Sequence, residues 1–420
     1  MRRVCWGSGA DVPALEADAT FGFDPYAIAD AHLSPAARAA LEGLQRTLER
    51  TIRPLLAEAW ETATMPPEVL DALIPLDLMA PAGVDAAEAG SSMFSGLRNY
   101  VLARTDVSVA TLYNAQSGLF RTAVALGGSP AQAAELDPRV RSFELKGVFA
   151  LTEPEHGSDI AGGLATTARR EGDQWVIDGR KKWIGGAAAS DVLVVFARDQ
   201  DDHEVKAFLV PTDADGVSVD AIGGKVSLRP MPNALITLRD VRVAEASRLQ
   251  NVNGWRDVAR ILRAMRSDVA WIAAGLQAGA LDAAVRYVRE RRQFDRPLGG
   301  FQLVQEKLAR MLGNTVASLA LVVQLSARQD GSTALAADAS PRLGGEYADE
   351  NSALAKMQTA RLARETVALG REVLGGNGIL LEHDVARFFA DAEAVYSYEG
   401  THEINALIVG RALTGASAFT

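Results

Sequence analysis

The 420-residue chain is predicted to be mostly α-helical with an inserted β-domain, because the spacing of its apolar residues changes twice. From about residue 34 to 132, apolar residues recur every three or four positions, as in amphipathic helices. From 148 to about 243 the period falls to two, in short β-branched runs separated by Gly, Asp and Pro. Helical spacing returns at Trp255. We therefore expect an N-terminal helical domain, a middle β-domain built as a small barrel or sandwich, and a C-terminal helical domain, over residues 1–147, 148–250 and 251–420.

Capping residues predict where two of these helices begin. Ser34 is followed by Pro35, a combination that fits an N-cap and the first helical residue. Near the other end of the chain, the hydroxyl of Thr401 fits the N-cap of a further helix.

The composition excludes several classes of function. The chain has 43 basic and 53 acidic residues, and this net charge of −10 disfavours a nucleic-acid partner. The single cysteine, Cys5, cannot form an internal disulfide. The start of the chain lacks the apolar run of a signal peptide, and we find no run of about 18 apolar residues that would span a membrane. We expect a cytoplasmic protein. No histidine has a partner at metal-ligand spacing, so no metal is expected.

Four segments carry residues suited to cofactor or substrate chemistry. FALTEPEHGSD, residues 149–159, is a turn with hydroxyls and free N–H groups, and GRKKWIGG places Trp183 in a strand. Arg291 precedes QFDRPL, and a guanidinium binds a diphosphate through paired charge-assisted hydrogen bonds. LGGNG lets the backbone pass close to a bulky ligand. YEGTHEI, residues 398–404, follows it and carries Glu399.

Together these segments resemble the acyl-CoA dehydrogenase family, from about residue 34 to the end of the chain. The similarity points to the branch that contains glutaryl-CoA dehydrogenases and short-chain acyl-CoA oxidases. The resemblance implies an N-terminal helical domain, a middle β-barrel-like domain and a C-terminal four-helix bundle. It also implies FAD as the cofactor and a homo-oligomer, a tetramer in many relatives.

The resemblance assigns a set of residues to FAD. The arginine that matches Arg291 binds the FAD pyrophosphate of a neighbouring subunit, and the tryptophan that matches Trp183 packs against the flavin. Two positions depart from the family pattern: Gly185 stands where many relatives have a threonine near flavin N5, and Asp295 replaces a glycine. The cofactor-binding residues expected from the resemblance are Phe149, Leu151, Thr152, Gly157, Ser158, Trp183, Gly185, Arg291, Phe294, Gln302, Gly375, Gly376 and Thr401.

The resemblance also implies the reaction. Glu399 matches the glutamate that removes the α-proton of an acyl thioester, while the β-hydride passes to flavin N5 and an α,β-double bond forms. The N–H of Glu399 and a ribityl hydroxyl of FAD would stabilise the enolate oxygen. Arg266 matches an arginine near this glutamate, and Tyr398 and Gly400 flank it on the substrate side.

A second comparison within the family concerns the acyl group. Glutaryl-CoA dehydrogenases hold the distal carboxylate of their substrate with an arginine. The corresponding segment of this chain is DVSVATLYNAQSGL, residues 106–119, and it has Ala110 at the position of that arginine. A distal carboxylate would lose this partner, so we expect a neutral or weakly polar short acyl group. Tyr113 and Asn114 are the pocket residues expected from this segment.

The sequence leaves three alternatives open. The acyl group could be carried by CoA or by an acyl carrier protein, since both present a pantetheine arm. The electrons could pass to an electron-transfer flavoprotein, or to oxygen in an oxidase of the same fold, which the departure at Gly185 favours. A non-enzymatic flavoprotein is a further possibility, against which the complete YEGT segment argues.

Overall fold

The computed structural model describes residues 32–332 and 349–416, so Cys5 lies outside the described residues. The N-terminal part is helical, as predicted. Its first helix begins at Pro35, and the Ser34 hydroxyl accepts a hydrogen bond from the Ala37 N–H at 3.1 Å, which confirms the predicted cap. A π-helical turn, Ala115–Phe120, follows α6. The helices are α1 (Pro35–Thr47), α2 (Leu56–Thr62), α3 (Glu68–Leu73), α4 (Ala86–Ala89), α5 (Ser92–Thr105), α6 (Val107–Asn114), α7 (Arg121–Gly127) and α8 (Pro130–Arg141).

The middle part forms one seven-stranded sheet in the order β1-β4-β2-β3-β7-β6, with β5 paired to β4. In the described residues the hydrogen-bonded path ends at β1 and at β6, and β5 pairs only with β4, so the sheet is curled but does not close into a barrel. A short helix, α9 (Ile160–Gly163), lies between the first two strands. The strands are β1 (Gly147–Ala150), β2 (Thr167–Glu171), β3 (Gln174–Gly185), β4 (Val192–Asp199), β5 (Val205–Pro211), β6 (Val217–Ala221) and β7 (Asn233–Ala244).

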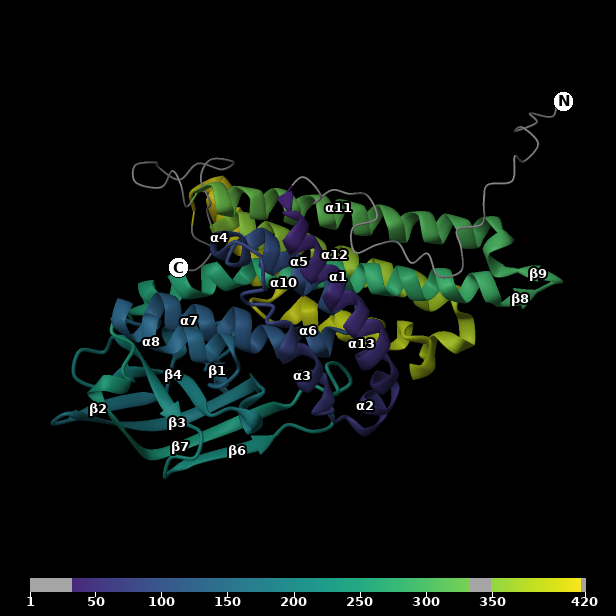
Figure 1. The fold of residues 1–420 in the computed structure, drawn as a ribbon. Coiled ribbons are helices and arrows are strands. Elements are labelled where there is room, and N and C mark those ends of the chain that lie inside the picture. The colour runs from purple at the N-terminus through teal and green to yellow at the C-terminus, as the bar shows by residue number, and fades with distance from the viewer. Residues whose placement is uncertain (1–31, 333–348, 417–420) are drawn as a thin grey trace.

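The C-terminal part is a helical bundle in which α10, α11, α12 and α13 pack together and α14 packs on α12. Thr401 caps α14, as predicted, because its hydroxyl accepts from the Ile404 N–H at 3.3 Å. Figure 1 shows the sheet beside the left half of the bundle and a two-stranded hairpin, β8 and β9, at its right end. The bounds are α10 (Trp255–Glu290), β8 (Arg292–Gln293), β9 (Arg296–Pro297), α11 (Gln302–Ser332), α12 (Asp349–Val373), α13 (Val385–Ser397) and α14 (His402–Thr414).

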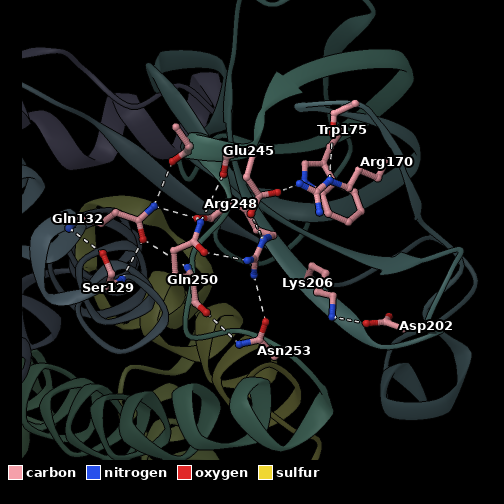
Figure 2. A network of polar contacts seen from close by, with 12 residues as sticks. Ser129, Gln132, Arg170, Trp175, Asp202, Lys206, Glu245, Arg248, Gln250 and Asn253 are labelled. Carbon is pink, nitrogen blue, oxygen red and sulfur yellow. Dashed lines mark hydrogen bonds and ion pairs between the residues drawn. The ribbon is translucent and has the colours of Figure 1, made fainter.

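The connection from the sheet to α10 is fixed by a polar network (Figure 2). Gln132 of α8 donates to the carbonyl oxygens of Ala246 and Arg248 at 3.1 and 2.8 Å. The Arg248 guanidinium in turn donates to Glu245 at 2.9 Å and to Asn253 at 3.1 Å. Because α8, the end of β7 and the start of α10 share these bonds, the middle domain has a defined orientation on the helices.

The largest apolar core joins the N-terminal helices to the C-terminal bundle. Within this core α5 and α10 approach each other closely, because two glycines make room. A Cβ added at Gly275 would lie 2.3 Å from the carbonyl oxygen of Tyr100, and one added at Gly96 would lie 2.1 Å from the indole nitrogen of Trp271. Such distances are far inside van der Waals contact, so α5 and α10 can only pack this closely with glycine at both positions.

One helix of the described chain, Gln302–Gly331, is long and apolar enough to cross a membrane by length and composition, a match that the sequence analysis did not find. Only 39% of its most apolar window is buried within this chain. The match is weak evidence for a membrane span, because core helices of soluble proteins meet the same criteria. This helix packs against α5, α10 and α12.

The α5–α10 contact can be tested with a pair of glycine substitutions. Gly275→Ala should lower the melting temperature, because the added methyl group collides with the α5 backbone and overpacking typically costs about 1–3 kcal/mol. Gly313→Ala on the exposed face of α11 is the matched control, since nothing lies within 4 Å of its added methyl group. It should raise the melting temperature slightly, by the helix propensity of about 1 kcal/mol. Equal effects of the two changes in thermal unfolding would contradict the close packing.

Candidate active site

Glu399 lies on a tight turn between α13 and α14. Both Glu399 and Gly400 have positive φ angles, 53° and 85°. A left-handed conformation at a non-glycine residue costs about 1–3 kcal/mol and persists only where the surroundings impose it. The turn is therefore held in one shape by its neighbours.

Lys356 of α12 holds this turn from the buried side. Its side chain is fully buried, and its ammonium group donates to the carbonyl oxygens of Tyr396 and Gly400 at 2.9 and 2.7 Å. Asn405 of α14 also donates to the Gly400 carbonyl, at 2.9 Å. The sequence analysis missed Lys356, although a lysine within the apolar run LAKMQTA was a detectable signal.

The charge on Glu399 depends on opposing influences. Burial raises its pKa above the ordinary value, while the positive charges of Arg266 and Lys356 lower it. Arg266 of α10 is thus within electrostatic reach of Glu399. Burial also lowers the pKa of Lys356 to about 8, against the opposing effect of Glu399. A carboxylate with a raised pKa is a stronger base in its ionised form, which suits removal of a weakly acidic proton.

Tyr398 and Asn114 lie near this turn, on elements far apart in the sequence. The Tyr398 hydroxyl is buried beside that of Thr111 on α6, yet neither makes a hydrogen bond of ordinary geometry with a described residue. Burial raises the pKa of Tyr398. Asn114, at the end of α6, accepts a hydrogen bond from Asn99 of α5 at 3.1 Å. Buried polar groups without partners are uncommon in folded proteins, so this side of the turn is suited to a polar ligand.

Tyr113, the other predicted pocket residue, is part of the apolar core. It is 1% exposed, its ring packs on Phe143 at 5.5 Å, and the Arg98 guanidinium lies 5.4 Å from its centre. Burial raises the pKa of its hydroxyl to about 12. Ala110, where a glutaryl-CoA dehydrogenase has an arginine, is fully buried.

Trp183 differs clearly from the nearby Trp175. The Trp183 side chain is 53% exposed and its φ is 67°, next to a register shift between β3 and β7. Trp175 is 4% exposed and packs on Phe208 with ring centres 5.2 Å apart. An exposed aromatic held by a strained backbone leaves a flat apolar face for a planar ligand, and this fits a flavin.

The segment with Thr152, Gly157 and Ser158 is joined to the Trp183 strand by a buried ion pair. Glu153 accepts hydrogen bonds from Lys181 at 2.8 Å and from the Thr166 N–H at 2.9 Å, and Lys181 is fully buried. Although burial raises the pKa of Glu153, Lys181 lowers it below its ordinary value.

Lys181 also donates to the Leu151 carbonyl oxygen at 3.1 Å, and the Lys182 N–H donates to the Thr152 carbonyl at 2.8 Å. These bonds fix the predicted cofactor loop against the strand. Phe149 packs on Phe196 with ring centres 4.8 Å apart and Leu151 is buried, so these two could contact a cofactor mainly through their backbone.

Met231 fills the space beside Gly185. A Cβ added at Gly185 would lie 2.3 Å from the Met231 methyl carbon, and Met231 is 1% exposed. The glycine that replaces the threonine of many relatives is therefore matched by a methionine that comes from the loop before β7. The sequence analysis missed Met231 because no local pattern links the two positions.

Thr401 caps α14 two residues after Glu399, whereas the other predicted cofactor residues lie at the far end of the bundle. Arg291 follows α10, and the 25 residues that separate it from Arg266 correspond to about 37 Å of helix. Phe294, in the hairpin, is 88% exposed, and Gln302 begins α11. A cleft of about 410 Å³ here is lined by residues including Arg291, Tyr287 and Asn377. Added Cβ atoms at the glycines before Asn377, Gly375 and Gly376, would meet nothing within 4 Å, which leaves the backbone open to a ligand.

Family models match almost the whole described chain. The acyl-CoA dehydrogenase N-terminal, middle and C-terminal domain models match residues 34–144, 148–241 and 252–414. The chain belongs to the acyl-CoA dehydrogenase family. It is therefore an FAD-dependent oxidoreductase that acts on the CH–CH bond of acyl-CoA. The exposed Trp183 and the open glycine turn fit the cofactor that this family uses.

The alignments with known relatives span most of this dehydrogenase. A 3-(aryl)acrylate reductase from Clostridium sporogenes is 31% identical over 86% of this chain and 94% of its own. The caffeyl-CoA reductase–Etf complex subunit CarC from Acetobacterium woodii is 27% identical over 84% of this chain and 92% of its own. A glutaryl-CoA dehydrogenase from Mycobacterium smegmatis, solved in complex with FADH2, has a TM-score of 0.84 and 29% identity, covering 93% of this chain and 97% of its own.

The effect of Arg266 on Glu399 predicts a pH shift. Because Arg266 lowers the pKa of Glu399, Arg266→Gln should raise that pKa further. Glu399 must be ionised to act as a base, so the acidic limb of the pH profile of kcat/KM should move to higher pH. Arg256→Gln, an exposed position on the same helix, is the control and should leave the limb in place. An unmoved limb in Arg266→Gln would show that another group controls it.

Proposed function

We propose that this enzyme oxidises a short-chain acyl-CoA to its α,β-unsaturated product, with Glu399 as the base that removes the α-proton. The observation that carries the proposal is the position of Glu399 on a half-buried, left-handed turn within electrostatic reach of Arg266 and Lys356. The carboxylate is thus partly shielded from water, yet two cations favour its ionised form. Both conditions are needed for a carboxylate that abstracts a weakly acidic proton.

Stabilisation of the enolate requires donors at the thioester oxygen. The helical hydrogen bonds of α13 end with the Tyr398 N–H, which donates to the Ala394 carbonyl at 2.9 Å. The Glu399 N–H lies one residue beyond this bond, and in our proposal it donates to the thioester oxygen. Lys356 contributes by positioning, because it ties the carbonyl oxygens on both sides of Glu399 to α12. A donor fixed before the reaction stabilises developing charge without reorganisation.

The cofactor site is built from the Trp183 strand, the loop that carries Thr152 and Ser158, and Thr401. When bound, FAD supplies the acceptor for the β-hydrogen. Trp183 offers a flat face, and the Glu153–Lys181 pair keeps the loop and strand together. The side chain nearest to Gly185 is the Met231 thioether, which provides no hydroxyl donor.

The separation of the cofactor residues supports a homo-oligomer. Trp183 lies in the β-domain, whereas Arg291 follows α10, about 37 Å of helix beyond Arg266. We propose that Arg291, Phe294 and the glycine turn serve the FAD of a second copy, in a homotetramer. Such an assembly would also cover the hairpin side chain of Phe294, which is 88% exposed in a single chain.

For the electron acceptor we propose an electron-transfer flavoprotein. The A. woodii relative is named as a subunit of a complex with such a protein, and it covers 84% of this chain. The oxidase alternative rests on Gly185, which could leave space for oxygen beside the flavin. The Met231 side chain occupies the space beside this glycine, and this argues against the oxidase.

Glu399→Gln should abolish oxidation of butanoyl-CoA while FAD stays bound. A positioned general base contributes about 10²–10⁴-fold to the rate, so anaerobic bleaching of the flavin absorbance should slow by at least about 10²-fold. Retained FAD absorbance and an unchanged melting temperature show that the variant is folded. Full bleaching at the wild-type rate would refute the role of Glu399.

The proposed acceptor predicts little hydrogen peroxide. Under air, turnover of butanoyl-CoA with an artificial electron acceptor or an electron-transfer flavoprotein should exceed peroxide release, measured with a peroxidase-coupled dye. A second measurement on Met231→Ala reports whether the thioether beside Gly185 limits access of oxygen, because peroxide release should then increase. Stoichiometric peroxide in the wild type would instead establish the oxidase.

A further inference from the structure

The chain lacks the substrate-binding arginine of glutaryl-CoA dehydrogenases, because Ala110 stands in its place, but it has another buried arginine on the neighbouring helix. Arg98 of α5 is 2% exposed. Its guanidinium donates to the Ser117 hydroxyl at 3.2 Å and to the Leu78 carbonyl at 3.4 Å, while its Nε has no partner. No carboxylate of the described residues forms a direct ion pair with it. A buried cation with unfilled donors is costly unless a ligand completes its shell.

An aspartate faces the same region from α10. The Asp268 Oδ2 atom lies 2.4 Å from the point that a Cβ at Gly118 would occupy, and the Asn114 Oδ1 atom lies 2.2 Å from it. Gly118 thus lets α10 and the π-helical turn bring two polar side chains together. Burial raises the pKa of Asp268 to about 6, Arg98 lowers it and Glu399 raises it. Asp268 is therefore within electrostatic reach of both Arg98 and the proposed base.

Further buried polar atoms lie on α5, on α6 and at the turn that carries Glu399. The Asn99 amide oxygen on α5 has no hydrogen-bond partner, while its amide nitrogen donates to Asn114. The hydroxyls of Thr111 and Tyr398 are within reach of each other but of no other described group. A purely hydrocarbon acyl chain would leave Arg98 Nε and the Asn99 oxygen unsatisfied, which is unfavourable for buried polar groups.

The charge balance selects among polar ligands. At the distal end Arg98 is offset by Asp268, while Arg266 and Lys356 act on Glu399 at the other end. An acyl group with a terminal carboxylate would add a negative charge beside Asp268 at the distal end. A terminal hydroxyl can accept from Arg98 and donate to Asp268 without a change in net charge.

We propose that the acyl group oxidised by this enzyme carries a neutral hydrogen-bonding group at its distal end, a hydroxyl, which Arg98 and Asp268 receive. This inference rests on the proposed function, because it assigns the substrate class of the same site. It narrows the neutral or weakly polar acyl group that the sequence predicts. Arg98 and Asp268 are then specificity-determining residues, distinct from the base.

The test compares acyl-CoAs that differ only in their terminal group. One series is pentanoyl-, 5-hydroxypentanoyl- and glutaryl-CoA, and a shorter one is butanoyl-, 4-hydroxybutanoyl- and succinyl-CoA. In at least one series, kcat/KM of the wild-type holoenzyme for the hydroxyl member should exceed that of both others by about tenfold. That factor corresponds to one hydrogen bond to a charged group.

Two variants and one control connect this preference to the residues. Arg98→Met should remove the preference for the hydroxyl, mainly through KM. The double variant Arg98→Leu with Asp268→Leu removes both charges together, which folded proteins tolerate better than one unpaired charge, and should favour the methyl member. Arg310→Met is the control, because Arg310 is paired with Glu365 at 2.8 Å on α11 and α12, and this variant should keep the wild-type preference.

The outcomes separate the inference from the proposed function. If the methyl members react as well as the hydroxyl members in wild type and in the double variant, the inference is overturned and the dehydrogenase mechanism stands. A preference for glutaryl- or succinyl-CoA overturns the hydroxyl in favour of an anion. If no member of either series bleaches the flavin, the proposed short-chain function fails, and the inference fails with it.

Discussion

The close contact between α5 and α10 determines where the other parts of the site can lie. Gly275 and Gly96 allow the two backbones to approach until the Tyr100 carbonyl and the Trp271 indole occupy the space of absent side chains. At larger separation, α5 could not present Arg98 toward the α10 face that carries Asp268. In the proposed acyl site, the N-terminal domain thus contributes Arg98, and the C-terminal domain contributes Asp268 and Glu399. Neither domain forms the site alone.

The same packing explains which parts of the site could be predicted from the sequence. Glu399 and Trp183 lie in contiguous segments of fixed spacing, and the order of apolar periods was enough to predict helical, β and helical domains. Lys356, Met231 and Asp268 are isolated residues within ordinary helices or loops. Their importance arises only from neighbours more than 40 residues away, which no local period or motif records. The middle domain was predicted as a small barrel or sandwich, and the sequence could not separate these from the curled, open sheet, because open and closed sheets share the same alternation.

The buried charges around the site are compensated in two ways. The fully buried Lys181 is matched by Glu153 in a direct ion pair, which fixes a loop. At the catalytic turn, two cations act on one carboxylate, because Arg266 and Lys356 both lower the pKa of Glu399 while burial raises it. The cations favour the ionised form, and burial makes that form a stronger base.

The length of α10 has a consequence for the cofactor. One helix joins Arg266, near the base, to Arg291, which follows its far end. In the proposed assembly each flavin nucleotide is held by residues of two copies, so loss of the cofactor and separation of the subunits become linked equilibria. Dilution then favours apoprotein, and added FAD favours association, by mass action. The oligomer would serve as a store of bound cofactor, and its abundance in the cell would determine how much of the enzyme is active.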